Sequence, residues 1–321
     1  MGERNFSVSP VQVFCFVIFY LLSGMLLFCG GSFFSALFAA LFFVCLCTVA
    51  AAFCLYKNSS AELYGGAFGR FAPLFRYIAA FFTSFYFMRT LFAFSDKFSS
   101  FYNNISAGAF APAVLLLCVL SVCRGFSRAS RFAELCVFAL AGAMLLSLLG
   151  SKGEGLSFAI DGDAIFGGFD AIGAAPVIFS LYARCVTPES EKASDFAKNG
   201  AFSPSPLLCG IAASACAFAA YAFFCFTGWK NIIISLAVCF FALSRLTLFA
   251  LSLADLFACP EKGEGVKSFF FAAALCSFWA VFGSFFPYAA KTAGIFAAVL
   301  FPCAVFISTV LERVKEATPK A

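Results

Sequence analysis

The sequence of 321 residues contains no histidine, and charged residues make up only 12% of it. Without histidine, Ser-His and Cys-His catalytic pairs are excluded, and so are the many metal sites that depend on imidazole ligands. Soluble domains contain about 25% charged and about 45–50% apolar residues, whereas 63% of this chain is hydrophobic. So little polar surface could not cover a fold in water. We therefore expect a polytopic membrane protein.

The 16 cysteines do not form a recognisable metal or redox pattern. No CxxC pair occurs, and most cysteines lie inside apolar runs, where a small side chain packs well between helices. Paired carboxylates within one apolar run are also missing. The net charge of +5 is scattered between these runs rather than gathered on one face. We predict no enzyme activity, no metal, no cofactor and no nucleic-acid partner.

Ten apolar runs approach the length of about 20 residues that a helix needs to cross a bilayer. The gaps between them leave no room for a soluble domain, so residues 1–321 are predicted to form a single all-α membrane domain. The run at 108–123 is the shortest, and a re-entrant segment is the alternative to a full span there. The ten runs are 11–30, 32–55, 72–95, 108–123, 131–150, 163–185, 205–228, 231–257, 267–286 and 289–311.

The basic residues support this arrangement of spans. If the N-terminus is cytoplasmic, 14 of the 21 Lys and Arg residues fall in cytoplasmic segments, including the 186–204 loop and the tail at 312–321. The alternate segments hold four, and the remaining three lie within spans. Because positively charged loops stay inside, both termini are predicted to be cytoplasmic. The four outer residues are Lys97, Lys152, Lys230 and Lys291.

Glycines in the first and sixth spans point to interrupted helices. Transporters often bind their substrate where two helices in corresponding halves of the chain unwind near the bilayer midplane. Ten spans divide into five plus five, so the first span, with Ser23-Gly24, would correspond to the sixth, which runs from Gly167-Gly168 to Pro176. Glycine weakens a helix and proline kinks it. A break near Gly168-Phe169-Asp170 is predicted, although glycines that only admit a neighbouring helix are the alternative.

Of the charged residues inside spans or at their edges, five bear on the site. Asp170 is costly within a bilayer and is expected to face a cavity, a partner or a substrate, unless it lies at the outer surface. Arg245, in the middle of its span, is expected to face the interior and to pair with a carboxylate or with free carbonyls. Arg89 is nearer a span end and is expected to snorkel to the surface. Arg131 and Glu134 are expected to form a local ion pair on one helix face.

Three segments resemble the spore-germination B-subunits, which belong to the amino acid–polyamine–organocation transporter superfamily, and a fourth resembles other members of that superfamily. The first span, SVSPVQVFCFVIFYLLSGMLL, is similar in its Ser-Pro-x-Gln lead and its glycine in mid-helix. CRGFSRASRFAEL (123–135) and FALSRLTLFAL (241–251) resemble the fifth- and eighth-span segments of that family, and GGFDAIG (167–173) resembles the sixth span of the superfamily's permeases. Thr247 stands where the family usually has an aspartate.

The resemblance implies a fold and a site. It implies a five-plus-five inverted repeat, with repeat one at about 9–150 and repeat two at about 160–311. The ligand, an amino acid or a similar small molecule, would bind between the first and sixth spans. Arg245, with Arg131 and Glu134, would supply structural or coupling charges. The implied ligand-binding residues are Leu22, Ser23, Gly24, Gly167, Gly168, Phe169 and Asp170.

The implied function is that of a germinant receptor subunit in a spore inner membrane or bacterial cell membrane. Its partners would be an A-type subunit and a lipoprotein C-type subunit. A secondary transporter that couples an amino acid to H⁺ or Na⁺ would use the same pocket and stays open as an alternative. Some proton-coupled permeases of the superfamily use a lysine in the fifth span, and residues 132–150 contain none, which favours the receptor. A channel is disfavoured, because no repeated polar positions suggest a pore.

Overall fold

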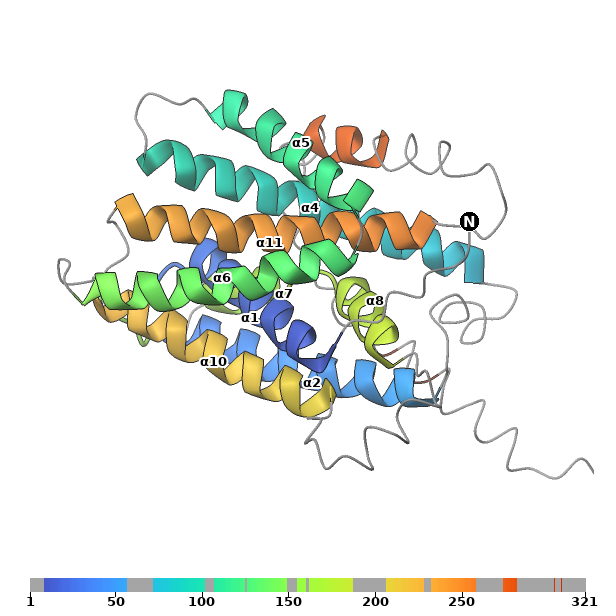
Figure 1. Ribbon diagram of the computed structural model, residues 1–321, viewed down its shortest axis with the longest axis horizontal. Coiled ribbons are helices and arrows are strands. Elements are labelled where there is room, and N and C mark those ends of the chain that lie inside the picture. Colours follow the sequence, from blue (N-terminus) through green and yellow to red (C-terminus); the bar gives the residue numbers. More distant parts are fainter. Residues whose placement is uncertain are drawn as a thin grey trace, which may run out of the picture.

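The structure, a computed structural model, is all-helical in the residues that it describes. These are 9–56, 72–101, 107–124, 126–148, 155–159, 162–186, 206–227, 232–257 and 274–281, together with 303 and 307. Apart from a short helical segment at 274–281, the helices are α1 (Pro10–Phe28), α2 (Phe33–Tyr56), α4 (Ala72–Phe101), α5 (Ala107–Arg124), α6 (Phe126–Ser147), α7 (Gly162–Ile172), α8 (Ala175–Val186), α10 (Pro206–Thr227) and α11 (Ile232–Phe257) (Figure 1).

Local sequence determines where α1 begins and ends. Ser9 and Gln12 form a capping box, in which the Ser9 Oγ accepts from the Gln12 amide at 3.2 Å and the Gln12 side chain accepts from the Ser9 amide at 3.0 Å. Pro10 occupies the first turn, where its missing N–H costs nothing. After the helix, Gly30 and Gly31 adopt φ values of 55° and 88°, a conformation that glycine favours.

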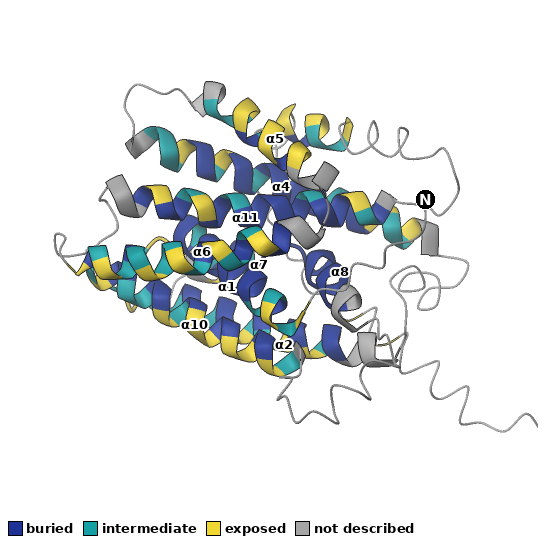
Figure 2. Ribbon diagram, in the orientation of Figure 1, coloured by how far each residue is buried: buried dark blue, intermediate teal, exposed yellow. Residues whose placement is uncertain are grey.

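Helix α1 and the α7–α8 pair form the centre of the described structure. Helix α1 packs against α10, α11, α6 and α7, and α2 covers the other side of α7. Within the apolar windows, 78% of α1 and 83% of Ile165–Tyr182 is buried, against 28% of Ala129–Ser147 in α6. Figure 2 shows the same contrast, with dark blue on the central helices and yellow along the outward faces of α5, α6 and α10.

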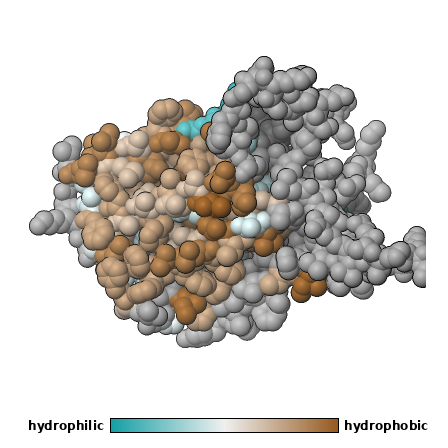
Figure 3. All heavy atoms as spheres, turned by 90° about the horizontal axis from the view of Figure 1, so that it is seen from below, coloured by the Kyte–Doolittle hydropathy of each residue, from teal (hydrophilic) through white to brown (hydrophobic). Residues whose placement is uncertain are grey.

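The outward faces carry large apolar side chains, which water would disfavour and lipid would accept. Figure 3 shows brown and tan atoms spread over most of the described surface on one face of the molecule. Among the described residues, seven helices are long and apolar enough to cross a membrane. The chain is therefore a multi-pass, all-α membrane protein. Its most exposed large residues include Phe138, Leu145, Leu135, Leu116, Leu41 and Phe226.

The first eight predicted spans fall on described helices. The predicted span at 108–123 is helix α5, whose apolar stretch, Phe110–Leu120, is shorter than the other seven. The predicted span at 267–286 is described only over 274–281, and the span at 289–311 lies almost entirely outside the described residues. Ten spans and the five-plus-five repeat therefore stay predictions.

Candidate functional site

The sixth span is interrupted, but at Gly173-Ala174 rather than near Gly168. Helix α7 ends at Ile172, and Gly173 adopts a φ of +72° while its amide donates to the Phe169 carbonyl at 3.0 Å. This left-handed glycine is a common way to end a helix. Helix α8 then starts at Ala175 with Pro176 in its first turn, where proline is tolerated. The predicted position was wrong because a positive φ followed by proline, and not the glycine pair, ends the helix.

Gly167 and Gly168 instead allow α7 to pack closely on its neighbours. A Cβ on Gly167 would lie 2.8 Å from the Phe28 carbonyl oxygen, and one on Gly168 would lie 2.7 Å from a ring carbon of Phe38. Phe169 also packs on α2, with its ring centroid 5.0 Å from that of Phe38. Both glycines lie within the continuous part of α7. They therefore match the alternative expectation, that these glycines only allow a neighbouring helix to pack closely.

The Ser23-Gly24 pair does not interrupt α1. The helix runs without a break to Phe28, Leu22 and Ser23 are fully buried, and the Ser23 Oγ donates to the Tyr20 carbonyl at 3.2 Å. A Cβ on Gly24 would overlap both the Arg245 guanidinium and the Ala171 carbonyl. The expected helix end at Gly24 is therefore absent, and this glycine makes room for an arginine from another helix.

Arg245 joins α11 to α1 and to the end of α7. Its side chain is fully buried, as predicted. Nη1 donates to the carbonyls of Tyr20 at 2.8 Å and Ala171 at 2.6 Å, and Nη2 donates to the carbonyl of Asp170 at 2.9 Å. The guanidinium carbon also lies 4.5 Å from the centre of the Tyr20 ring and 5.4 Å from that of Phe249. Of the two predicted kinds of partner, a carboxylate or carbonyls of an interrupted segment, the second is observed at Asp170 and Ala171, whereas the Tyr20 carbonyl belongs to the continuous helix α1.

The interrupted helix explains why these carbonyls can accept from an arginine. The last carbonyls of a helix have no amide four residues ahead and carry the negative end of its dipole. Asp170 and Ala171 are in that position on α7. On α1 the Tyr20 carbonyl is reachable because the residue four positions later, Gly24, has no side chain. Removing a guanidinium from water costs several kcal/mol, and three carbonyls with two aromatic faces compensate for part of that cost.

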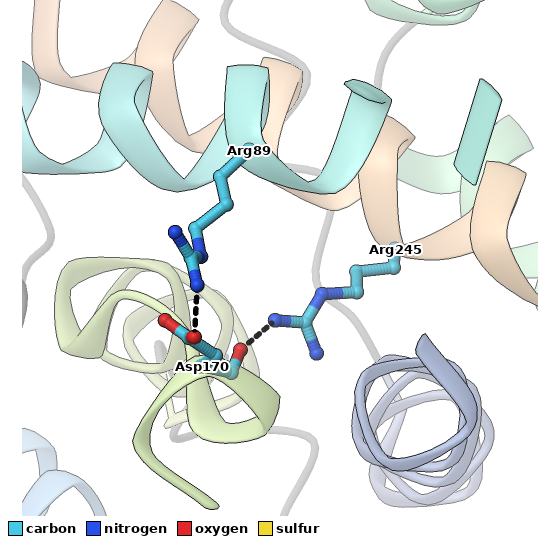
Figure 4. Close-up of polar contacts among 3 residues, drawn as sticks. All are labelled: Arg89, Asp170 and Arg245. Carbon is cyan, nitrogen blue, oxygen red and sulfur yellow. Dashed lines mark hydrogen bonds and ion pairs between the residues drawn. The ribbon is translucent and has the colours of Figure 1, made fainter. Parts of the chain in front are cut away.

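Arg89 does not snorkel but forms an ion pair with Asp170. Its Nη2 donates to the Asp170 Oδ2, with side chains that are 27% and 11% exposed. In Figure 4, Arg89 from α4 and Arg245 from α11 both point toward Asp170, one to its carboxylate and the other to its carbonyl oxygen. The sequence contained both arginines and the aspartate, but it could not indicate which arginine reaches the carboxylate and which the backbone.

Several donors at the break have no acceptor among the described residues. The Tyr20 hydroxyl and the Arg245 Nε are buried without a hydrogen-bond partner in that part of the chain. The hydroxyl lies beside the amide of Ala174, although no hydrogen bond of normal geometry joins them. The amide of Ala175, at the start of α8, likewise has no acceptor in the described ranges. These groups together favour a negatively charged group at the break.

Arg131 and Glu134 lie away from this site, on α6. Arg131 is exposed and Glu134 is partly buried, and among the described residues no ion pair joins them. Glu134 instead lies near enough to Cys15 of α1 to interact with it electrostatically. The predicted local pair is therefore not formed among the described residues.

The described part of the chain offers no metal centre. It contains no group of three or more His, Cys, Asp or Glu side chains that could hold an ion. The cysteines in that part are free thiols, most of them buried among apolar neighbours.

In comparisons with known proteins, no family model and no curated sequence matches the chain.

Proposed function

We propose that the chain is the B-type membrane subunit of a spore germinant receptor and that it binds an amino acid or a similar small molecule beside the α7–α8 break. It acts in the spore inner membrane, or in a bacterial cell membrane, with an A-type and a lipoprotein C-type subunit. The observation that carries the proposal is the interrupted α7–α8 helix meeting α1 around Arg245. The arginine lies in a segment that resembles that family, and the sixth-span segment resembles the amino acid permeases of its superfamily.

The charges at the break support an amino acid as the ligand. Arg89 and Arg245 bring two positive charges, and Asp170 brings one negative charge, so one positive charge is in excess among these three. A ligand carboxylate fits the start of α8, where the amide of Ala175 and the hydroxyl of Tyr20 have no acceptor among the described residues. A ligand ammonium fits the Asp170 carboxylate, where it replaces the guanidinium of Arg89 as the ion-pair partner.

The replacement of Arg89 by the ligand ammonium would change the contact between α4 and α7, and this change is the proposed signal. Without ligand, the ion pair between Arg89 and Asp170 connects α4 to the end of α7. When an ammonium replaces the guanidinium, α4 is released from α7 while the backbone contacts of Arg245 stay in place. A change in the contact between two helices can be passed to partner subunits without transport of the ligand, because a ligand shifts a conformational equilibrium by its differential affinity.

Binding and uptake measurements test this proposal. The purified chain in lipid nanodiscs is screened for saturable binding of radiolabelled amino acids, and the same protein in liposomes is tested for uptake under H⁺ and Na⁺ gradients. We expect binding without accumulation. Asp170→Asn, which keeps size but removes the charge, is expected to weaken binding at least tenfold at a normal protein level.

Two results contradict the proposal. Accumulation driven by an ion gradient identifies a transporter instead of a receptor subunit. Unchanged affinity in Asp170→Asn means that the ligand ammonium does not meet this carboxylate, and the site at the break is then wrong. Gly142→Ala serves as the control variant, because an added Cβ at Gly142 meets nothing within 4 Å.

A further inference from the structure

Arg245 occupies a position that resembles a site for a small free cation. Three carbonyl oxygens converge on its guanidinium at 2.6–2.9 Å, from the middle of α1 and from the last turn of α7. Backbone carbonyls at an interrupted helix are the groups with which membrane proteins hold alkali cations. Here the positive charge is covalently part of the chain and is fully buried.

The surroundings are shaped around this charge. Gly24 and Gly173, on two different elements, both lack the atom that would meet the guanidinium: a Cβ on Gly24 would overlap Nη1, and one on Gly173 would lie 2.8 Å from Nη2. The rings of Tyr20 and Phe249 cover the remaining sides at 4.5 and 5.4 Å from the guanidinium carbon. Two glycines, three carbonyls and two rings thus surround the two terminal nitrogens of the guanidinium.

We infer that Arg245 is a built-in cation at the junction of α1 and α7, and that it takes the place of a bound Na⁺ or K⁺. The junction is therefore formed whether or not alkali cations are present. Where the proposed ligand binding holds, it follows that the binding is independent of Na⁺ and K⁺. Only this last clause rests on the proposed function, since the junction itself can be tested without any ligand.

The experiment measures thermal unfolding in detergent with a thiol-reactive dye, which reports the exposure of buried cysteines such as Cys47 and Cys118. Wild-type protein is compared in sodium, potassium and choline chloride, and we expect the same melting temperature in all three. Arg245→Ala is expected to melt about 5–10 °C lower. Guanidinium at millimolar concentration, far below denaturing levels, is expected to restore part of this loss by entering the vacated space.

Arg131→Ala is the matched control, because it removes an arginine that is exposed on α6. It is expected to melt like wild type, with no effect of guanidinium. If Arg245→Ala does not fold, Arg245→Lys replaces it: it keeps the charge but cannot reach three carbonyls at once, so we expect it to fold and to melt below wild type.

Three outcomes overturn the inference. One is a wild-type melting temperature that rises in sodium or potassium over choline, since the site then takes a free cation. The second is an Arg245→Ala variant that melts like wild type. The third is rescue by guanidinium that is no greater in Arg245→Ala than in Arg131→Ala. A chain that binds no amino acid but gives the expected melting pattern disproves the proposed function and leaves the built-in cation in place.

Discussion

Helix α1 and the α7–α8 pair pass through the same core, and each has glycine in its middle, yet only the second is interrupted. Helix α1 is continuous from Pro10 to Phe28 through Gly24, whereas the other span stops at Gly173 and restarts at Ala175. The difference lies in the backbone: Gly173 has a φ of +72°, and Gly24 does not have a positive φ. Pro176 then favours a new first turn. Glycine by itself therefore does not end a helix within a membrane protein's core.

The two glycines nevertheless serve one purpose, because both face the guanidinium of Arg245. At Gly24 the helix α1 continues, and the missing side chain leaves room for the arginine to reach a carbonyl of α1. Gly173 ends its helix, so that carbonyls of α7 become free to accept. One contact thus needs an intact helix on one side and an interrupted helix on the other.

The largest effect is expected for Gly24→Ala. The new Cβ would overlap the Arg245 guanidinium and the Ala171 carbonyl, and backbone atoms of a packed helix cannot move away cheaply. Displacing Arg245 leaves a buried charge without its acceptors, at a cost of about 3–5 kcal/mol. Chemical unfolding in mixed micelles measures this loss.

Gly142→Ala is the comparison for Gly24→Ala, since Gly142 lies inside helix α6 and an added Cβ there meets nothing within 4 Å. We expect it to be neutral or to stabilise by about 0.5–1 kcal/mol, because alanine favours a helix over glycine. Equal stability of the two variants would show that Gly24 has no special contact with Arg245.

An intermediate effect is expected for Gly173→Ala. A side chain in the left-handed region costs about 1–2 kcal/mol, and the Cβ would also crowd the Tyr20 hydroxyl and the Arg245 Nη2. Gly30→Ala separates the two causes, because Gly30 also has a positive φ, of +55°, but open space around it. The same unfolding assay should show a larger loss for Gly173→Ala. If the two losses are equal, only the backbone conformation matters at the break.

The smallest effect on stability is expected from the side-chain charges at the break. Arg89→Gln, Asp170→Asn and the double variant form a thermodynamic cycle for the ion pair between α4 and α7. Because the Arg89 side chain is 27% exposed, solvent weakens the pair, and we expect a coupling of about 1 kcal/mol or less. Asp170→Asn keeps the carbonyl that accepts from Arg245, so the break itself should persist. A loss as large as that of Gly24→Ala would mean that the carboxylate, and not the carbonyls, holds the junction.

The sequence alone determined that this is a helical membrane protein and that Arg245 is buried. Apolar runs of about 20 residues fit membrane helices, which satisfy every backbone group within one span, and the part of the chain that the structure describes contains seven helices of sufficient length. An arginine in the middle of such a run is too costly to face lipid. Its burial in the interior, as observed for Arg245, follows from that cost, whereas the choice of backbone carbonyls over a carboxylate does not.

Only the tertiary structure decided where the sixth span breaks and which partners the charges take. Gly167, Gly168 and Gly173 are alike in sequence, and the close approach of Phe28 and Phe38 to the first two identifies them as packing positions. Asp170 had two possible arginine partners on separate helices, and which one reaches its carboxylate depends on how α4 and α11 lie beside α7. Such choices depend on distances between elements far apart in the chain, which periodicity and composition do not encode.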